Sequence, residues 1–260
     1  MSLLEVNNLK KVYVGRFGGH KVEALKSVSF TAEQGEFIAI MGESGSGKTT
    51  LLNILAALDR PTAGNVILDG RDLGKIKESE MSAFRRDNLG FVFQEFNLLD
   101  TFSIRDNIFL PLVLRGIKHD EMEQKLVPAA KALGISDILN KFPYEVSGGQ
   151  KQRAAIARAI ITDPKILLAD EPTGALDSKS SDELLKLFGG INQSGQTILM
   201  VTHSTKAAAH AKRVLFIRDG AVFHQLYRAN STVDLMYRKI SDALTVMASG
   251  SEANEGGGEE

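Results

Sequence analysis

Short apolar runs alternate along this chain with stretches of helical composition. Residues 3–13 and 24–31 alternate apolar and polar positions, which is typical of half-buried antiparallel strands, and the glycine-rich segment 16–21 between them predicts a hairpin loop. The continuous apolar run at 37–41 instead predicts a strand buried on both faces, and segment 48–58 has helical composition. The pattern therefore begins with an antiparallel pair and continues with a buried strand that leads into a helix.

Beyond two further predicted strands at 65–68 and 89–94, the middle of the chain has a different character. Residues 95–161 contain helix-forming residues with spaced Leu, Ile and Val and end in an Ala-rich basic stretch, so we expect a helical insertion there. Strand-like and helical segments then alternate, which predicts a mostly parallel sheet. These strands are expected at 165–169, 197–201 and 213–217, and the helices at 178–192 and 205–211.

The C-terminal part of the sequence predicts a hairpin, a helix and a polar tail. Asp219 and Gly220 predict a turn into a strand at 221–227, and apolar positions at helical spacing predict a helix over 231–247. Residues 249–260 are small, polar or acidic, and we therefore expect them to be disordered.

The composition excludes several classes of protein. The 260 residues carry 31 Lys and Arg against 32 Asp and Glu, so a net charge of −1 offers no polybasic surface, and we expect no nucleic-acid partner. The absence of Cys excludes a disulfide scaffold and a thiolate zinc site. No apolar run approaches the roughly 18 residues of a membrane span, and Glu5 interrupts the apolar core that a signal peptide needs. We expect a cytoplasmic protein that reaches a membrane only through a partner.

The strongest chemical signal is a G-x-x-x-x-G-K-[ST] motif between a predicted strand and a predicted helix. Its glycines let the backbone close around phosphate, and the helix N-terminus adds positive potential. Lys48 of the motif reaches the β- and γ-phosphate oxygens, and the Thr49 hydroxyl holds Mg²⁺. A chance glycine-rich turn is the alternative, which the strand–turn–helix context disfavours. The predicted phosphate-binding residues are Gly42, Glu43, Ser44, Gly45, Ser46, Gly47, Lys48, Thr49 and Thr50.

A second signal is a pair of acids at the end of the apolar strand predicted near 166–169. A P-loop needs a further carboxylate for its metal, supplied from the end of a neighbouring strand. Asp170 would hold Mg²⁺, and Glu171 would act as the general base towards the attacking water. A strand that simply leaves the core is the alternative for this pattern taken alone.

The third signal opens the basic helix that ends the helical insertion. A Ser and two Gly before an Ala-rich basic helix make a second anion cradle by the same helix-terminus physics. A small-molecule kinase has no use for a second cradle, which disfavours that class, although a plain helix cap would explain Ser-Gly-Gly alone. The residues concerned are Ser147, Gly148, Gly149 and Gln150.

Together, these motifs resemble the ATP-binding subunit of ABC transporters over about residues 3–220. The resemblance implies that segment 42–49 is the Walker A motif, 166–171 the Walker B motif and 146–150 the signature, in which Val146 stands where the family most often has Leu. It implies an α/β fold of the P-loop NTPase class: a RecA-like mixed sheet flanked by helices, with an antiparallel β subdomain and an inserted helical subdomain.

The chain then divides into four parts. The ATP-binding core with its antiparallel subdomain comprises residues 1–94 and 162–227, and the helical subdomain with the signature comprises 95–161. A C-terminal helix is assigned to 228–248 and the polar tail to 249–260.

The resemblance also implies roles outside the three main motifs. Gln94 is similar to the Q-loop glutamine, which contacts the metal, and Asp177 lies in a segment, 174–177, that is similar to the D-loop. His203 is similar to the switch histidine at the γ-phosphate, and Tyr13 to the aromatic residue that stacks on adenine. The alternatives are an ordinary surface role for His203 and simple packing for Tyr13.

The implied activity is an ATPase whose sites are shared between two chains, with ATP and Mg²⁺ as cofactors. Lys48 and Thr49 of one subunit and the signature of the other would enclose each ATP, so that two nucleotides close a homodimer. An integral-membrane permease would dock near residues 95–109, at the Q-loop and helical subdomain, and hold the ATPase at the inner face of the membrane.

Segments 91–99 and 171–177 are similar to the mechanotransmitter group, which serves macrolide efflux, lipoprotein release, cell division or defence against antimicrobial peptides. The stretch 219–247 is most like the bacitracin- and lantibiotic-resistance branch. Through its permease this branch also implies sensing with a histidine kinase, so a signalling ATPase without transport remains an alternative. A DNA-repair or ribosome-acting ABC protein is disfavoured, because neither a coiled-coil insertion nor a second ATPase unit is present in the sequence.

Overall fold

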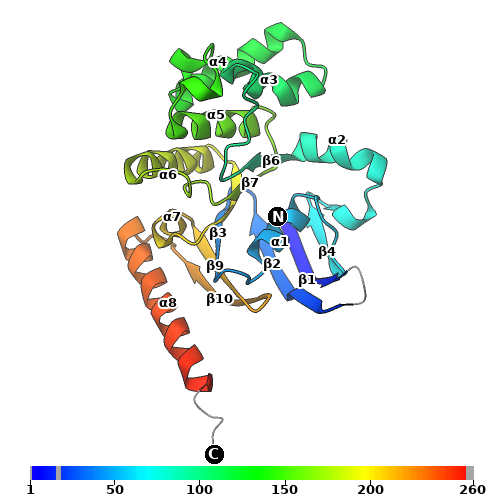
Figure 1. Cartoon of the computed structure of the whole chain (residues 1–260), viewed down its shortest axis with the longest axis vertical. Helices are drawn as coiled ribbons and strands as arrows, with labels where there is room; N and C mark the ends of the chain where they lie inside the picture. Colours follow the sequence, from blue (N-terminus) through cyan, green and yellow to red (C-terminus); the bar gives the residue numbers. More distant parts are fainter. Residues whose placement is uncertain (1, 16–18, 256–260) are drawn as a thin grey trace, which may run out of the picture.

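The computed structural model describes residues 2–15 and 19–255, which form one ten-stranded sheet with helices on both faces (Figure 1). The strand order is β5-β4-β1-β2-β10-β9-β3-β8-β7-β6. Strands β9, β3, β8, β7 and β6 run parallel and form the core. Strands β2, β1, β4 and β5 pair antiparallel with one another, whereas β10 is antiparallel to β9 and pairs in parallel with β2. The predicted mixed α/β fold is confirmed.

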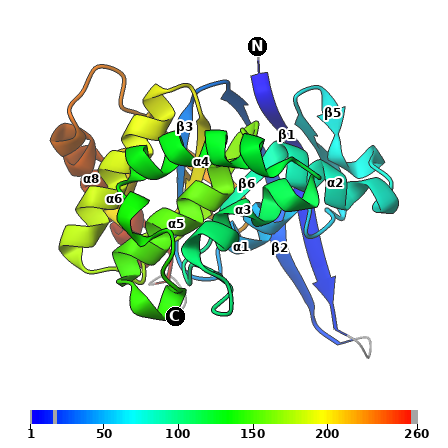
Figure 2. The same cartoon turned by 90° about the horizontal axis from the view of Figure 1, so that it is seen from above.

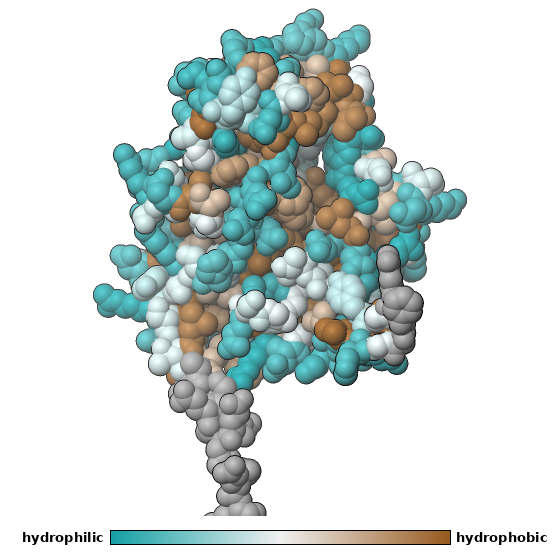
Figure 3. Space-filling view, viewed as in Figure 1, coloured by the Kyte–Doolittle hydropathy of each residue, from teal (hydrophilic) through white to brown (hydrophobic). Residues whose placement is uncertain are grey.

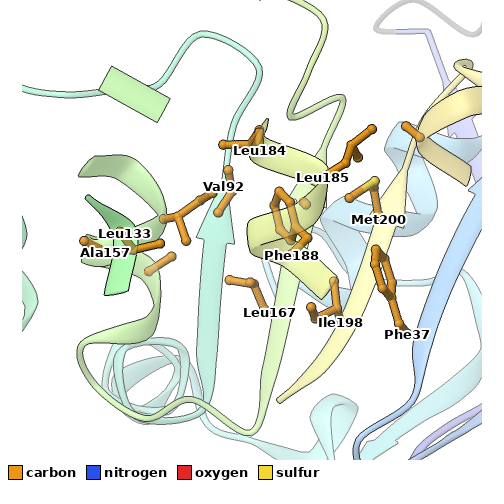
Figure 4. Close-up of a cluster of buried hydrophobic side chains, with 14 of the residues drawn as sticks. Phe37, Val92, Leu133, Ala157, Leu167, Leu184, Leu185, Phe188, Ile198 and Met200 are labelled. Atoms are coloured by element: carbon orange, nitrogen blue, oxygen red, sulfur yellow. The ribbon is translucent and has the colours of Figure 1, made fainter. Parts of the chain in front are cut away.

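Both faces of the parallel core are buried, which explains the continuous apolar runs of the sequence. In β3 (Phe37–Met41), Phe37 belongs to one hydrophobic cluster and Ile38 to another on the opposite face. Figure 4 shows the first cluster, in which Phe188 of α6 (Ser178–Gln193) packs on Phe37 with ring centroids 6.4 Å apart. The other core strands are β6 (Leu89–Val92), β7 (Ile166–Asp170), β8 (Thr197–Val201) and β9 (Arg213–Arg218).

The antiparallel strands are longer than the alternation in the sequence predicts. Strands β1 (Ser2–Val14) and β2 (Lys21–Glu33) pair along a long hairpin. Of the predicted loop at 16–21, Lys21 already belongs to β2, and 16–18 lie outside the described residues. The remaining strands are β4 (Ala63–Leu68), β5 (Arg71–Asp72) and β10 (Ala221–Tyr227).

Two helices cover the face of the sheet that carries Ile38. Helix α1 (Lys48–Leu55) is shorter than predicted, because Ala57 adopts a left-handed φ of 54° and the Leu58 N–H bonds back to the Asn53 carbonyl at 2.9 Å. Helix α2 (Glu78–Asn88) follows the short 3₁₀ turn η1 (Leu73–Lys75) and has no counterpart in the sequence prediction. It is mostly polar and has two buried apolar side chains, Met81 and Phe84.

Helices α3, α4 and α5 all lie within residues 95–161, the predicted helical subdomain. Figure 1 places them at one end of the molecule, beyond β6, and Figure 2 shows them overlying the core from above. Arg115 connects this subdomain to the core, since its guanidinium donates to Asp87 and to the carbonyls of Arg86 and Thr162, each at 3.0 Å. The elements are α3 (Ile104–Leu114), α4 (His119–Leu133), η2 (Ser136–Ile138), η3 (Pro143–Glu145) and α5 (Gly148–Ile160).

The last helix, α8 (Val233–Glu255), packs against α7 (Thr205–Ala209) and runs down one side of the molecule (Figure 1). Met236 and Ile240 of α8 are fully buried. The helix continues seven residues into the segment predicted to be disordered, so that prediction is wrong for residues 249–255. The rest of that segment, 256–260, lies outside the described residues. In the described part of the chain no helix has the length and apolar character for crossing a bilayer.

Candidate functional site

The loop between β3 and α1 approaches other backbone so closely that two of its residues must be glycine. A Cβ on Gly42 would lie 2.2 Å from the Ile217 carbonyl oxygen, and one on Gly47, whose φ is 101°, would lie 2.4 Å from that of Ala24. No side chain caps α1, so the N–H groups of its first turn are available to an anion. In this loop Glu43, Ser44, Gly45 and Thr49 are exposed, Thr50 is half-buried and Ser46 is buried.

Lys48 folds back over the loop that precedes it. Its Nζ donates to the carbonyl oxygens of Gly42 at 2.8 Å and Glu43 at 2.7 Å. Burial lowers the pKa of Lys48, and the nearby carboxylates of Glu171 and Asp170 oppose that shift. The ammonium is therefore held where phosphate oxygens could replace the two carbonyl partners.

The carboxyl ends of β7 and β8 bring Glu171 and His203 together. The two strands are parallel neighbours, and the Glu171 N–H donates to the Val201 carbonyl at 2.9 Å. Glu171 has a left-handed φ of 44°, which turns its side chain towards the segment after β8. Its Oε1 accepts from the His203 N–H at 2.9 Å and lies 2.8 Å from His203 Nδ1. An ionised carboxylate only accepts, so Nδ1 is the donor and Nε2 is left free to face a ligand.

Asp170 ends β7 beside this pair, and its surroundings suit a cation. Burial raises the pKa of Asp170, and the neighbouring Glu171 raises it further while Lys48 opposes both effects. A partly desolvated carboxylate of this kind is stabilised by a bound positive ion. The described residues hold no group of three or more His, Cys, Asp or Glu that is arranged to bind a metal ion. One carboxylate, the Thr49 hydroxyl, the Gln94 amide and substrate phosphates would together form an oxygen donor set of the kind that Mg²⁺ takes, and this set stays a prediction.

The predicted signature residues open α5 in the helical subdomain. Ser147 and Gln150 form a capping box: the Ser147 hydroxyl accepts from the Gln150 N–H at 3.3 Å, and the Gln150 side chain accepts from the Ser147 N–H at 3.0 Å. The structure does not bring this helix N-terminus to the P-loop, because α5 and α1 lie in different layers of the molecule (Figure 1). One chain thus presents two separate anion cradles.

The Q-loop, signature and D-loop segments adjoin one another within the chain. A Cβ on Gly174 would lie 3.0 Å from the Gln94 amide nitrogen, and one on Gly148 would lie 3.5 Å from the Leu176 side chain. Asp177 caps α6: its carboxylate accepts from the Ser180 N–H at 2.9 Å and from the Ser180 hydroxyl at 2.7 Å. These hydrogen bonds from Ser180 hold the pKa of Asp177 below its ordinary value. Its nucleotide contact stays a prediction.

Tyr13 lies near the end of β1 and is fixed by two residues that sequence reasoning missed. Its hydroxyl donates to Asp59 at 2.8 Å, while Lys11 bonds to the same carboxylate at 2.5 Å and stands 4.8 Å above the ring. The ring is 42% exposed. Lys11 and Tyr13 are two residues apart on β1 and so lie on one face of the strand. This spacing is the feature of the sequence that could have identified Lys11 as a partner of Tyr13. The loop residue Asp59 gave no comparable signal. Adenine stacking stays a prediction for this ring.

Two hollows mark opposite edges of the sheet. One of about 760 Å³, bordered by Gln34, Lys165 and Gln196, lies at the amino ends of the parallel strands and contains none of the predicted site residues. Another of about 490 Å³ is bordered by loop residues 42–46 and by Leu244 and Met247 of α8. Ligands of open α/β sheets bind at the carboxyl ends of the strands, so we expect the nucleotide at the second edge, where the phosphate-binding loop lies.

A loop that requires glycine, between a parallel strand and a helix, together with acids at the end of a nearby strand, defines a P-loop nucleoside triphosphatase. The ABC transporter family model matches residues 25–174. The chain therefore belongs to the ABC transporter family, and it is an ATP-binding cassette ATPase that hydrolyses ATP to ADP and phosphate.

Several relatives match most of the chain. It is 47% identical over 255 residues to the ABC transporter ATP-binding protein YxdL of Bacillus subtilis, with 98% of this chain and 97% of that protein covered. It is 45% identical over 248 residues to the bacitracin export ATP-binding protein BceA of Halalkalibacterium halodurans, with 95% and 97% covered. It also matches the dimeric cassette MJ0796 with a TM-score of 0.78 and 38% identity, covering 86% of this chain and 98% of that one.

Proposed function

We propose that this ATPase works as a homodimer in which each ATP binds between the P-loop of one subunit and the signature segment of the other. The main support for this proposal is that the N-termini of α1 and α5, the two expected anion-binding sites, lie apart within one chain. Each cradle has half of the donors that a triphosphate needs, and a second copy supplies the missing half. The dimeric state of the solved cassette MJ0796 supports this arrangement.

Within each composite site, Glu171 is the general base for hydrolysis. Its carboxylate takes a proton from the attacking water, and the two hydrogen bonds from His203 hold it in place. A proton on Nε2 of His203 would let that atom donate to the γ-phosphate while Nδ1 stays bonded to Glu171, and Lys48 neutralises charge on the β- and γ-phosphate oxygens. Loss of the bridging γ-phosphate removes the attraction between the two cradles and reopens the dimer.

We propose Mg²⁺ as the metal of the site, held by Asp170, Thr49 and Gln94. When bound, the metal neutralises phosphate charge. Gln94 links this site to the helical subdomain, because it follows β6 and precedes the segment that leads into α3.

A groove between the core and the helical subdomain is the proposed docking site for a membrane permease. It measures about 320 Å³ and is bordered mainly by apolar side chains, including Phe91, Phe93, Pro111 and Leu114. Figure 3 shows apolar side chains gathered over α3, where Leu114 is 62% exposed. A groove beside Gln94 that accepts an apolar helix would connect nucleotide occupancy to the membrane protein.

For the biological role we propose resistance to antimicrobial peptides of the bacitracin and lantibiotic type, including their sensing through a permease and a histidine kinase. The bacitracin exporter BceA matches 95% of this chain and 97% of its own length. Macrolide export is the second candidate, supported by 44% identity over 220 residues to the macrolide export protein MacB of Hyphomonas neptunium. That match covers 85% of this chain and 34% of MacB, so it leaves part of this chain without a counterpart.

Reconstitution with a permease that co-purifies with this ATPase from its native membranes tests the role. The complex is placed in lipid vesicles, and ATP hydrolysis is measured with bacitracin, with a macrolide and without either compound. Stimulation by bacitracin alone supports peptide resistance, whereas stimulation by the macrolide alone replaces it with the second candidate. A complex that does not form contradicts the permease coupling.

A further inference from the structure

Gln152 is a buried polar side chain on α5. It is not among the residues proposed above for ATP hydrolysis. It is 0% exposed, although it lies in the first turns of the helix whose N-terminus carries the signature. Its amide nitrogen donates to the Phe93 carbonyl at 3.1 Å and to the Pro172 carbonyl at 2.7 Å. Its Oε1 is buried and accepts no hydrogen bond from the described residues. Burying an amide oxygen without a hydrogen bond destabilises the folded state. The two hydrogen bonds that the amide nitrogen donates offset part of this cost.

The two carbonyls that Gln152 binds are those next to the proposed catalytic groups. Phe93 directly precedes Gln94, and Pro172 directly follows Glu171. Both hydrogens of one NH₂ group are therefore used to join the Q-loop to the segment after Walker B. The donor stands on the helix that begins with the signature.

A second contact from α5 holds the same Q-loop. The Arg158 guanidinium donates to the Phe96 carbonyl at 3.0 Å and to the Asn97 carbonyl at 2.6 Å. Both loop residues have positive φ, 62° and 51°, a conformation that needs such support in residues other than glycine. Of these two α5 side chains, Gln152 also binds the segment after Glu171, through the Pro172 carbonyl.

We propose that Gln152 is a positioning residue that couples the two ATP sites of the dimer. The inference rests on the proposed homodimer, in which the signature of a subunit contacts the ATP on its partner's P-loop, while Glu171 and Gln94 of that subunit serve its own ATP. A displacement of α5 caused by the partner's nucleotide has to move Phe93 and Pro172 with it or break both hydrogen bonds. Occupancy of one site thereby changes the geometry of Glu171 and Gln94 at the other.

The test uses the full-length protein and measures ATP hydrolysis against ATP concentration. In Gln152→Met the side chain keeps its length but loses both donors. We expect the Hill coefficient to fall from near two, about the limit for two coupled sites, towards one. We expect kcat to fall about tenfold, because Glu171 and Gln94 are no longer held in their productive geometry, with little change in KM. Gln152→Asn is the second variant, since it keeps the amide on a shorter stem that cannot reach both carbonyls at once.

Asn192 provides a matched control on α6. It is also a buried amide whose nitrogen donates to two backbone carbonyls, those of Gly35 at 3.0 Å and Gln196 at 2.9 Å, away from the nucleotide edge. We expect Asn192→Leu to lower Tm as Gln152→Met does, but to keep the Hill coefficient and kcat.

The possible results distinguish coupling through Gln152 from the proposed ATP site shared between two subunits. If either Gln152 variant folds and keeps both the Hill coefficient and kcat of the wild type, coupling through Gln152 is overturned. A wild type that hydrolyses ATP with a Hill coefficient of one overturns the coupling but leaves the ATPase in place. A dimer that forms and hydrolyses ATP normally without its signature glycines overturns the shared-site function itself.

Discussion

The Oε1 atom of Glu171 accepts two hydrogen bonds from one residue, His203: one from the backbone N–H at 2.9 Å and one from ring Nδ1 at 2.8 Å. The histidine therefore contacts the carboxylate with its backbone and its side chain, on the carboxyl edge that β7 and β8 share. The pair fixes which oxygen of Glu171 stays free. Mutating each residue should therefore reveal a different role: Glu171 as the proton acceptor and His203 as the residue that orients it.

Glu171→Gln tests the proton acceptor. The amide keeps the size of the side chain and one acceptor oxygen for His203, but it cannot take a proton from water. We expect hydrolysis to fall by a factor of about 10² to 10⁴, with ATP still bound, so that closed dimers accumulate. ATPase assays and light scattering with ATP measure both effects. Turnover at the normal rate would remove Glu171 from the proposed role.

His203→Ala tests the orienting partner. The side chain is 74% exposed, so we expect Tm to change little while kcat falls at least about tenfold and ATP affinity is retained. His119→Ala is the control, because that side chain is similarly exposed at 69% and lies on α4. Equal kcat values in the two variants would contradict a role for His203 at the γ-phosphate.

Gly149→Asp tests the shared site. The new carboxylate places negative charge at the N-terminus of α5, where the partner's ATP is proposed to bind. A Cβ there lies 3.2 Å from the Ser180 hydroxyl, so Tm is measured as well. We expect the variant to bind ATP on its own P-loop but not to dimerise or hydrolyse it. Gly189→Asp, on α6 with open space around its Cβ, should dimerise normally. Dimers of the Gly149 variant would argue against the composite site.

The parts of the site that could be predicted are those encoded within a few consecutive residues. The P-loop follows from the strand–turn–helix order around Lys48. The meeting of Glu171 and His203 follows from two parallel strands that end at one edge. The mixed α/β fold follows from apolar runs of strand length alternating with helical segments, and the structure confirms it.

Features that depend on tertiary packing could not be predicted. Helix α2 buries only Met81 and Phe84, so its apolar pattern is too sparse to identify. Gln152 appears in the sequence as one more polar residue of a basic helix, and its burial results from the packing of α5 on two distant loops. The tether of Tyr13 to Asp59 joins residues 46 positions apart.

That tether leads to a pH dependence of stability. Burial alone would raise the pKa of Asp59, but hydrogen bonds from Lys11, Tyr13 and the Arg60 N–H together outweigh it and hold the pKa below its ordinary value. A depressed folded-state pKa contributes stability above the unfolded-state pKa and loses it as pH falls through the folded-state value. We expect Asp59→Asn to cost about 1 kcal/mol at pH 7, a small figure because the site is partly exposed.

Urea unfolding from pH 7 down to pH 3 measures this effect. The difference in unfolding free energy between wild type and Asp59→Asn should shrink as the pH falls and the wild-type carboxyl is protonated. Residues other than Asp59 titrate in both proteins, so their contributions cancel in the difference. A difference that stays constant with pH would show that the charge of Asp59 does not stabilise the fold.

The permease groove yields a prediction with a close control. Leu114 on α3 and Val127 on α4 are both 62% exposed, but Leu114 borders the apolar groove beside the Q-loop, whereas Val127 lies outside it. A buried carboxylate in an apolar interface is strongly unfavourable. We therefore expect Leu114→Asp to abolish co-purification with the permease, and Val127→Asp to leave it intact. Because both positions are exposed in the isolated ATPase, its hydrolysis without permease should be similar in the two variants. If both variants bound the permease equally well, docking would have to occur on another surface.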